Sequence, residues 1–164
     1  MPPKAKIHVP ALGTLAVVAN SPAGETFWAG TFRYDDDGTR CDSRFFLCVR
    51  SGHEPAPAQC DFASKMLAAI DQRIHDARQL LKDTLAGDPA LFGIDAAGAA
   101  RYLSKGDALL PFAVPEPTFF EPGDWQLRFA ESPLPSCAAH GVAVAFVGTR
   151  PDHVEDLSES AELS

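Results

Sequence analysis

The chain has 164 residues, 46% apolar and 22% charged, which is the composition of an ordinary soluble globular protein. It has no apolar run near the roughly 20 residues of a membrane span, and its first residues lack the apolar segment of a signal peptide, so we expect a cytoplasmic protein. Its net charge of −8 argues against direct binding of nucleic acid, because phosphate contacts need a basic surface. The same charge permits a basic protein partner.

Three strands are predicted in the first third of the chain. Residues 15–18 are apolar and lie between Gly13 and an Asn-Ser-Pro-Ala-Gly turn. Residues 27–34 and 45–49 each alternate apolar and other side chains, as half-buried strands do. Residues 35–39 (Asp-Asp-Asp-Gly-Thr) form the hairpin loop between them. These three strands predict an antiparallel meander.

The clearest pattern is helical and covers residues 61–86. Asp61 is placed to cap the first turn, and Gly87 follows the last one. Arg73 interrupts the apolar stripe, so its side chain either snorkels from the edge of the contact or pairs with a buried carboxylate. The apolar side chains that share an arc of about 140° are Phe62, Ala63, Met66, Leu67, Ile70, Ile74, Ala77, Leu80, Leu81 and Leu85.

Residues 89–123 are the hardest to assign. Short helical turns are expected near residues 91–92 and 99–103, where nearby glycines weaken the helical pattern. Prolines 111, 115, 117 and 122 are predicted to exclude regular structure until Gly123.

Two further strands and an acidic tail complete the chain. Residues 125–129 alternate apolar and polar side chains, whereas residues 142–147 are apolar throughout, as in a central strand. After Arg150 there are five acidic residues and no Lys or Arg, so we expect an acidic, partly mobile tail from about residue 151. The predicted fold is a single α+β domain, residues 1–164, with an antiparallel sheet of about five strands packed on one long amphipathic helix.

The three consecutive aspartates, Asp35, Asp36 and Asp37, are the most prominent polar cluster. A calcium loop spaces its oxygen ligands at alternate positions and adds a distant bidentate Glu, and neither feature is present here. We therefore interpret the cluster as a solvated turn.

No catalytic motif, metal site or cofactor site is predicted. The four cysteines are irregularly spaced, as expected of reduced thiols. Cys137 and His140 have a Cys-x-x-His spacing, but zinc needs about four ligands and no second pair accompanies them. Glycine-rich phosphate loops and Gly-x-Ser-x-Gly are also lacking. A small enzyme that uses Cys137 and His140 as a nucleophile pair stays an alternative.

The C-terminal third resembles a family of small bacterial domains found among immunity proteins of polymorphic and contact-delivered toxin systems. The similarity rests on Trp-x-Leu-x-Phe at residues 125–129, Gly-Val-x-Val-x-Phe-x-Gly at 141–148 and Pro-x-x-Val-x-Asp-Leu-Ser at 151–158. The resemblance implies a non-enzymatic cytoplasmic inhibitor that binds a neighbouring toxin. It identifies no contact residue.

The clustered acids motivate a hypothesis about where a partner binds. An acidic surface raises the association rate with a basic protein, so we predict that a cognate toxin or secreted effector contacts one of the two acidic clusters. A chaperone or adaptor for an effector is an alternative, and an exposed edge strand would allow a homodimer. The predicted contact residues are Asp35, Asp36, Asp37, Asp152, Glu155 and Asp156.

Overall fold

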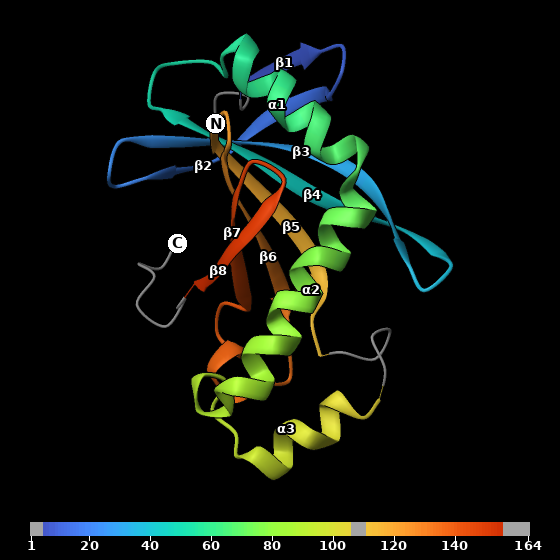
Figure 1. Ribbon diagram of the computed structural model, residues 1–164. Coiled ribbons are helices and arrows are strands. Elements are labelled where there is room, and N and C mark those ends of the chain that lie inside the picture. The colour runs from blue at the N-terminus through green and yellow to red at the C-terminus, as the bar shows by residue number, and fades with distance from the viewer. Residues whose placement is uncertain (1–4, 106–110, 156–164) are drawn as a thin grey trace.

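A computed structural model describes residues 5–105 and 111–155 of the protein. Eight strands form one sheet in chain order (Figure 1). Neighbouring strands are antiparallel except β4 and β5, which run parallel. The strands are β1 (Lys6–Val9), β2 (Gly13–Ser21), β3 (Glu25–Asp36), β4 (Thr39–Arg50), β5 (Ala113–Glu121), β6 (Asp124–Glu131), β7 (Val142–Val147) and β8 (Arg150–Glu155).

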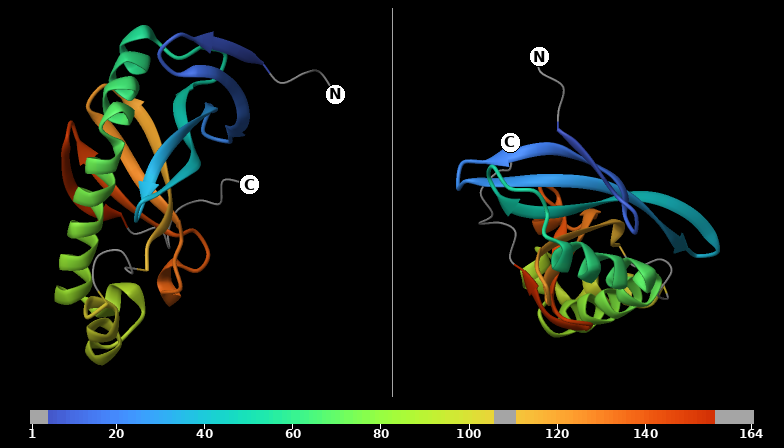
Figure 2. Two further views of the ribbon diagram at one scale, coloured as in Figure 1. Left: turned by 90° about the vertical axis from the view of Figure 1, so that its right-hand side faces the viewer. Right: turned by 90° about the horizontal axis from the view of Figure 1, so that it is seen from above.

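The helices lie mainly between β4 and β5, because parallel neighbours need a long crossover. They are α1 (Pro57–Ala68), α2 (Ile70–Gly87), the 3-10 turn η1 (Pro89–Phe92) and α3 (Ala96–Leu103), and a short turn η3 (Pro135–Cys137) connects β6 to β7. The side views show α1 and α2 on one face of a strongly twisted sheet (Figure 2). Buried apolar side chains of both layers form one cluster. Within the described residues, no helix has the length and apolar character needed to cross a membrane.

The predicted sheet of about five antiparallel strands is wrong, because the sheet has eight strands and is mixed. The five predicted strands lie within β2, β3, β4, β6 and β7, so the error concerns β1, β5 and β8. The four residues of β1 are too few for a decisive pattern. Strand β8, which reads Arg-Pro-Asp-His-Val-Glu, occupies the start of the expected mobile tail, whereas residues 156–164 lie outside the described part of the chain.

The predicted single long helix is also wrong, because it is two helices. Helix α1 begins at Pro57 rather than at Asp61, since proline suits the first helical position, where its missing N–H would have no partner in any case. Ala69 then leaves the helical conformation, with φ −116° and ψ 29°, and α2 starts at Ile70. The bend places α1 against β5 and α2 against β3, β7 and β8.

The apolar stripe continues through this bend. The helical period of the stripe identified the face that packs on the sheet. The same period continues across the interruption at Ala69, so it could not show that there are two helices. The stripe residues that are buried are Ala63, Met66, Ile70, Ile74, Ala77, Leu81 and Leu85.

Strand β5 forms in spite of its prolines, which overturns the predicted absence of regular structure up to Gly123. The carbonyl oxygen of Pro115 accepts a hydrogen bond from the Ser43 hydroxyl of β4 at 2.7 Å, so the main chain of Pro115 faces β4. Pro117 has the same strand parity and faces the same way. Strands β4 and β5 pair through only two residues of each, so the missing N–H groups of these prolines remove no hydrogen bond from the ladder.

The short parallel pairing of β4 and β5, which we call the parallel junction, is bridged by Gln59 of α1. Its side chain is buried, and its amide Nε2 donates to the carbonyl oxygens of Cys48 at 3.0 Å, Phe119 at 3.1 Å and Phe120 at 2.9 Å. One amide group therefore contacts the main chain of both β4 and β5. It satisfies carbonyl groups at the point where the two strands separate.

We expect Gln59→Leu to lower the free energy of unfolding by about 2–3 kcal/mol, because an apolar side chain of similar size leaves buried carbonyl groups unpaired. Gln72→Leu, the same replacement at an exposed position of α2, should change it by less than about 0.5 kcal/mol. Urea unfolding followed by circular dichroism measures both. Equal effects of the two replacements would show that Gln59 does not stabilise the junction.

Candidate functional site

The β3–β4 hairpin ends in the three predicted aspartates. Asp35 and Asp36 are the last residues of β3, and Asp37 and Gly38 form the turn with φ of 50° and 84°. Positive φ at both central residues is the geometry of a tight hairpin turn, for which Asp-Gly is a favoured pair. The carboxylate of Asp35 also accepts a hydrogen bond from the Gly38 amide at 3.2 Å. The predicted turn is confirmed at Asp37 and Gly38, whereas the predicted loop over residues 35–39 is too long, because Asp35 and Asp36 belong to β3 and Thr39 to β4.

The hairpin tip is held against α2. The Asp71 carboxylate on α2 accepts one hydrogen bond from the Asp35 amide at 2.8 Å and one from the Arg40 guanidinium at 3.3 Å. Asp36 forms a longer ion pair with Arg78 of α2 at 3.9 Å. Two of the carboxylates in this region therefore fix the hairpin to the helix as well as adding negative charge.

Arg78 lies between the hairpin and β5–β6 and is largely buried. Its guanidinium donates to the Phe112 carbonyl oxygen at 2.9 Å and lies 5.5 Å from the centre of the Phe129 ring. Burial lowers the pKa of Arg78, while Asp36 and Tyr34 act in the opposite direction. Its Nε–H meets no acceptor among the described residues. This cation thus joins α2 to two parts of the sheet.

The second predicted cluster lies on β8. The imidazole of His153 contacts Asp152 through Nδ1 at 2.8 Å and Glu155 through Nε2 at 3.0 Å. The hydrogen bond with Asp152 is the largest cause of a raised pKa of His153. Arg150 pairs with Asp152 at 3.7 Å. The remaining predicted residue, Asp156, lies outside the described residues.

Arg73 connects α2 to the turn before β8. Its guanidinium donates to the Thr149 carbonyl oxygen at 2.5 Å and pairs with Asp76, one turn along the same helix, at 3.4 Å. The side chain is mostly buried, yet its carboxylate partner is on α2 itself and is 26% exposed. Arg73 therefore pairs with a carboxylate as the second alternative predicted, but that carboxylate is partly exposed rather than buried.

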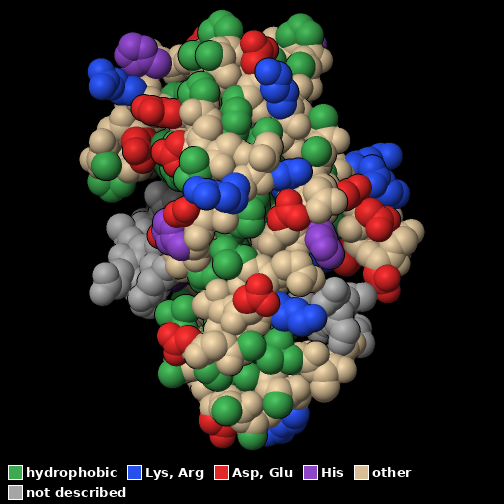
Figure 3. All heavy atoms as spheres, in the orientation of Figure 1, with side chains coloured by type: hydrophobic (Ala, Val, Ile, Leu, Met, Phe, Trp, Pro, Cys, Tyr) green, Lys and Arg blue, Asp and Glu red, His purple; other side chains and the backbone are tan. Residues whose placement is uncertain are grey.

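Helix α2 thus separates the two predicted acidic clusters. The hairpin lies on one flank of α2 and β8 on the other (Figure 1). In the same orientation, acidic side chains gather around the hairpin tip with arginine or lysine side chains among them (Figure 3). Clusters far apart in the sequence therefore flank one helix, and we take α2 with its two flanks as the candidate binding surface.

The alternative nucleophile pair has no activating geometry. Cys137 is buried in the core cluster, and burial raises the pKa of its thiol, although a hydrogen bond with Ser132 acts the other way. A nucleophilic cysteine needs a lowered pKa. The His140 carbonyl oxygen accepts a hydrogen bond from Arg128 at 3.1 Å, and no hydrogen bond joins the imidazole to a described residue. In residues 5–105 and 111–155, no three His, Cys, Asp or Glu side chains are grouped to hold a metal ion.

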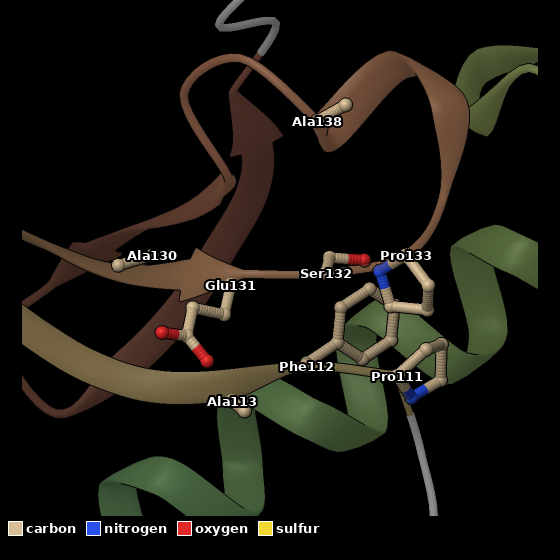
Figure 4. A pocket seen from close by; sticks show the side chains of 8 residues that line it. All are labelled: Pro111, Phe112, Ala113, Ala130, Glu131, Ser132, Pro133 and Ala138. Atoms are coloured by element: carbon tan, nitrogen blue, oxygen red, sulfur yellow. The ribbon is translucent and has the colours of Figure 1, made fainter.

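A shallow pocket of about 450 Å³ lies at the start of β5 and the end of β6. Figure 4 shows the rings of Pro111, Phe112 and Pro133 close together, with the Glu131 carboxylate directed away from them. The Ser132 hydroxyl already accepts a hydrogen bond from the Leu134 amide at 3.3 Å. This lining offers no nucleophile paired with a base.

Sequence reasoning missed the residues that attach the hairpin to α2. It assigned no role to Asp71, Arg40 or Arg78. A signal for Arg78 exists, because it follows Ile74 by four positions and precedes Leu81 by three, which places it on the buried side of the helix. The carboxylate that it meets could not be identified in this way.

Both edges of the sheet carry features that oppose pairing with another strand. Strand β1 has only four residues, and β8 contains Pro151 and the charged Asp152 and Glu155. Short edges, proline and charge are the means by which native sheets avoid edge-to-edge association. These edges do not favour the homodimer that an exposed strand would allow.

Comparison of the chain with protein-family models, with curated proteins and with solved structures finds no match.

We expect Asp152→Asn to lower the pKa of His153 toward 6.5, the value of an unperturbed histidine, because the charged hydrogen-bond acceptor is lost. Glu155→Gln, the control, should lower it less, since Asp152 is the larger cause. Titration of the His153 imidazole by NMR measures both. Folding raises the pKa of His153, so the protonated imidazole makes its full contribution to stability below pH 6.5. This contribution is lost as the pH rises through the pKa of His153 in the folded protein. A larger change in Glu155→Gln would contradict the assignment.

Proposed function

We propose that this chain is a non-enzymatic protein that binds a basic partner protein through α2, with the β3–β4 hairpin as the main acidic flank. The observation that carries the proposal is the charge on that flank, where four carboxylates accompany two guanidiniums. The carboxylates belong to Asp35, Asp36, Asp37 and Asp71, and the guanidiniums to Arg40 and Arg78.

The flank formed by β8 is closer to neutral and has the secondary role. There the carboxylates of Asp76, Asp152 and Glu155 accompany Arg73 and Arg150. His153 adds a positive charge when it is protonated, so this flank loses its net negative charge at lower pH.

Asp37 is the residue best placed to meet a partner. It is exposed at the tip of the hairpin and makes no ion pair with a described residue. The carboxylates of Asp35, Asp36 and Asp71 already accept a hydrogen bond or form an ion pair within the chain. Negative charge at such a surface raises the association rate with a basic protein by roughly 10–10³-fold at low salt.

The partner that we propose is a bacterial toxin acting on nucleic acid, with this chain as its cytoplasmic immunity protein. The resemblance of the C-terminal third to immunity domains motivates this assignment. A nucleic-acid-directed toxin needs a basic surface to hold phosphates, and such a surface is complementary in charge to the hairpin flank. Binding there would cover the toxin's substrate surface without any catalytic step.

The proposal is tested with the product of the neighbouring gene as the partner. We expect the two chains to co-purify, and Asp37→Asn to slow association by about 2–5-fold at low salt. Asparagine suits this position because it tolerates the positive φ. The difference should vanish at about 0.5 M salt, where exposed charges are screened.

Glu54→Gln is the matched control. It removes the same charge from an exposed residue in the connection before α1, and it should leave the association rate nearly unchanged. Equal rates for Asp37→Asn and the unmodified chain would exclude the hairpin as the contact surface. Separate elution of the co-expressed chains would exclude the immunity role for that partner.

A further inference from the structure

The face of the sheet that points away from α1 and α2 carries a charged cluster at the parallel junction. Arg44 of β4 and Arg128 of β6 lie on this face, because their neighbours Phe45 and Phe129 are buried in the core. Glu116 of β5 is opposite Arg128 in the strand register. Three adjacent strands therefore contribute one charged side chain each.

Glu116 holds both guanidiniums in place. One carboxylate oxygen of Glu116 accepts a hydrogen bond from Arg128, and the other accepts one from Arg44 at 3.4 Å. The Glu116 side chain is only 7% exposed, whereas Arg44 is 58% and Arg128 34% exposed. Arg44 also lies over the ring of Phe46, 5.2 Å from its centre. The buried carboxylate and the ring thus restrict two cations that remain open to solvent.

The cluster has more donors than acceptors. A guanidinium has five N–H donors. Towards described residues, Arg44 uses one nitrogen, and Arg128 uses two, because it also donates to the His140 carbonyl oxygen at 3.1 Å. Two cations around one anion leave a local charge of +1, in a chain whose net charge is −8. Unused donors and positive charge therefore face solvent together.

We propose that Arg44 and Arg128 form a binding site for an oxyanion, a carboxylate or a phosphate, on the sheet face opposite α2. Guanidinium groups bind both kinds of oxyanion through paired, charge-assisted hydrogen bonds. Because Glu116 already restricts the two side chains, the ligand orders fewer rotatable bonds when it binds. The same carboxylate repels an incoming anion, which weakens the binding of a single small anion. This site does not depend on the proposed basic partner.

The test is an NMR titration of the full chain with sodium phosphate and, separately, with sodium acetate, at an ionic strength held constant with sodium chloride. We expect saturable shifts of the backbone amides around residues 44 and 128. Arg44→Gln should weaken binding by about ten-fold, because it removes one charged donor pair. Arg44 is exposed enough for this variant to keep the fold, which the amide spectrum itself verifies.

Arg33→Gln is the control, because Arg33 is an exposed arginine of the neighbouring strand β3 whose charge is already paired with Asp42 at 3.1 Å. It should leave the titration unchanged. Saturation by phosphate alone identifies the ligand as a phosphoryl group, and saturation by acetate identifies a carboxylate. The proposal is overturned by the absence of saturation with both anions, by unchanged binding in Arg44→Gln, or by an equal loss in Arg33→Gln.

Discussion

The parallel junction between β4 and β5 is the constraint on which the rest of the structure depends. It joins two four-stranded halves of the sheet through only two paired residues on each strand. Side chains compensate for the short pairing: Gln59 from the helix side, Ser43 across the gap, and Glu116 with its two arginines on the opposite face. A buried polar group that loses its hydrogen-bond partner costs about 1–3 kcal/mol, so these polar contacts affect the stability of the whole sheet.

Helix α2 makes the contacts that hold both flanks of the candidate binding surface in place. Arg78 and Asp71 hold the hairpin on one flank, and Arg73 holds the turn before β8 on the other. The charges that would attract a partner are therefore partly the charges that position the surface. Charges tied into internal pairs add less to a partner contact than those that stay solvated, which leaves Asp37 at the tip of the hairpin as the most available group.

The hairpin flank of α2 and the β4–β5 junction on the opposite face differ in the sign of their local excess charge. The α2 face has more carboxylates than cations around the hairpin, whereas the junction on the opposite face has two guanidiniums around one carboxylate. Such a separation orients the chain in the field of a charged partner before contact. A basic protein would meet the hairpin side first, and an anionic group would meet the arginines behind it.

The sequence by itself determined the elements whose buried face repeats within a few residues. Alternation at Trp125, Leu127 and Phe129 identified β6, and the helical period identified the side of α1 and α2 that packs on the sheet. The Asp-Asp-Asp-Gly stretch predicted the turn at the tip of the β3–β4 hairpin, which the structure has at Asp37 and Gly38. These features depend on local periodicity and turn chemistry, which the chain displays directly.

Only the tertiary structure decided the features that depend on distant segments. Strand β5 tolerates its prolines because their missing N–H groups face the gap beside β4, and β8 becomes a strand because β7 is there to pair with it. The contacts of Asp71 with the hairpin and of Glu116 with Arg44 join residues 31 to 72 positions apart. No local period encodes such pairs, because the crossover between β4 and β5 is what brings them together.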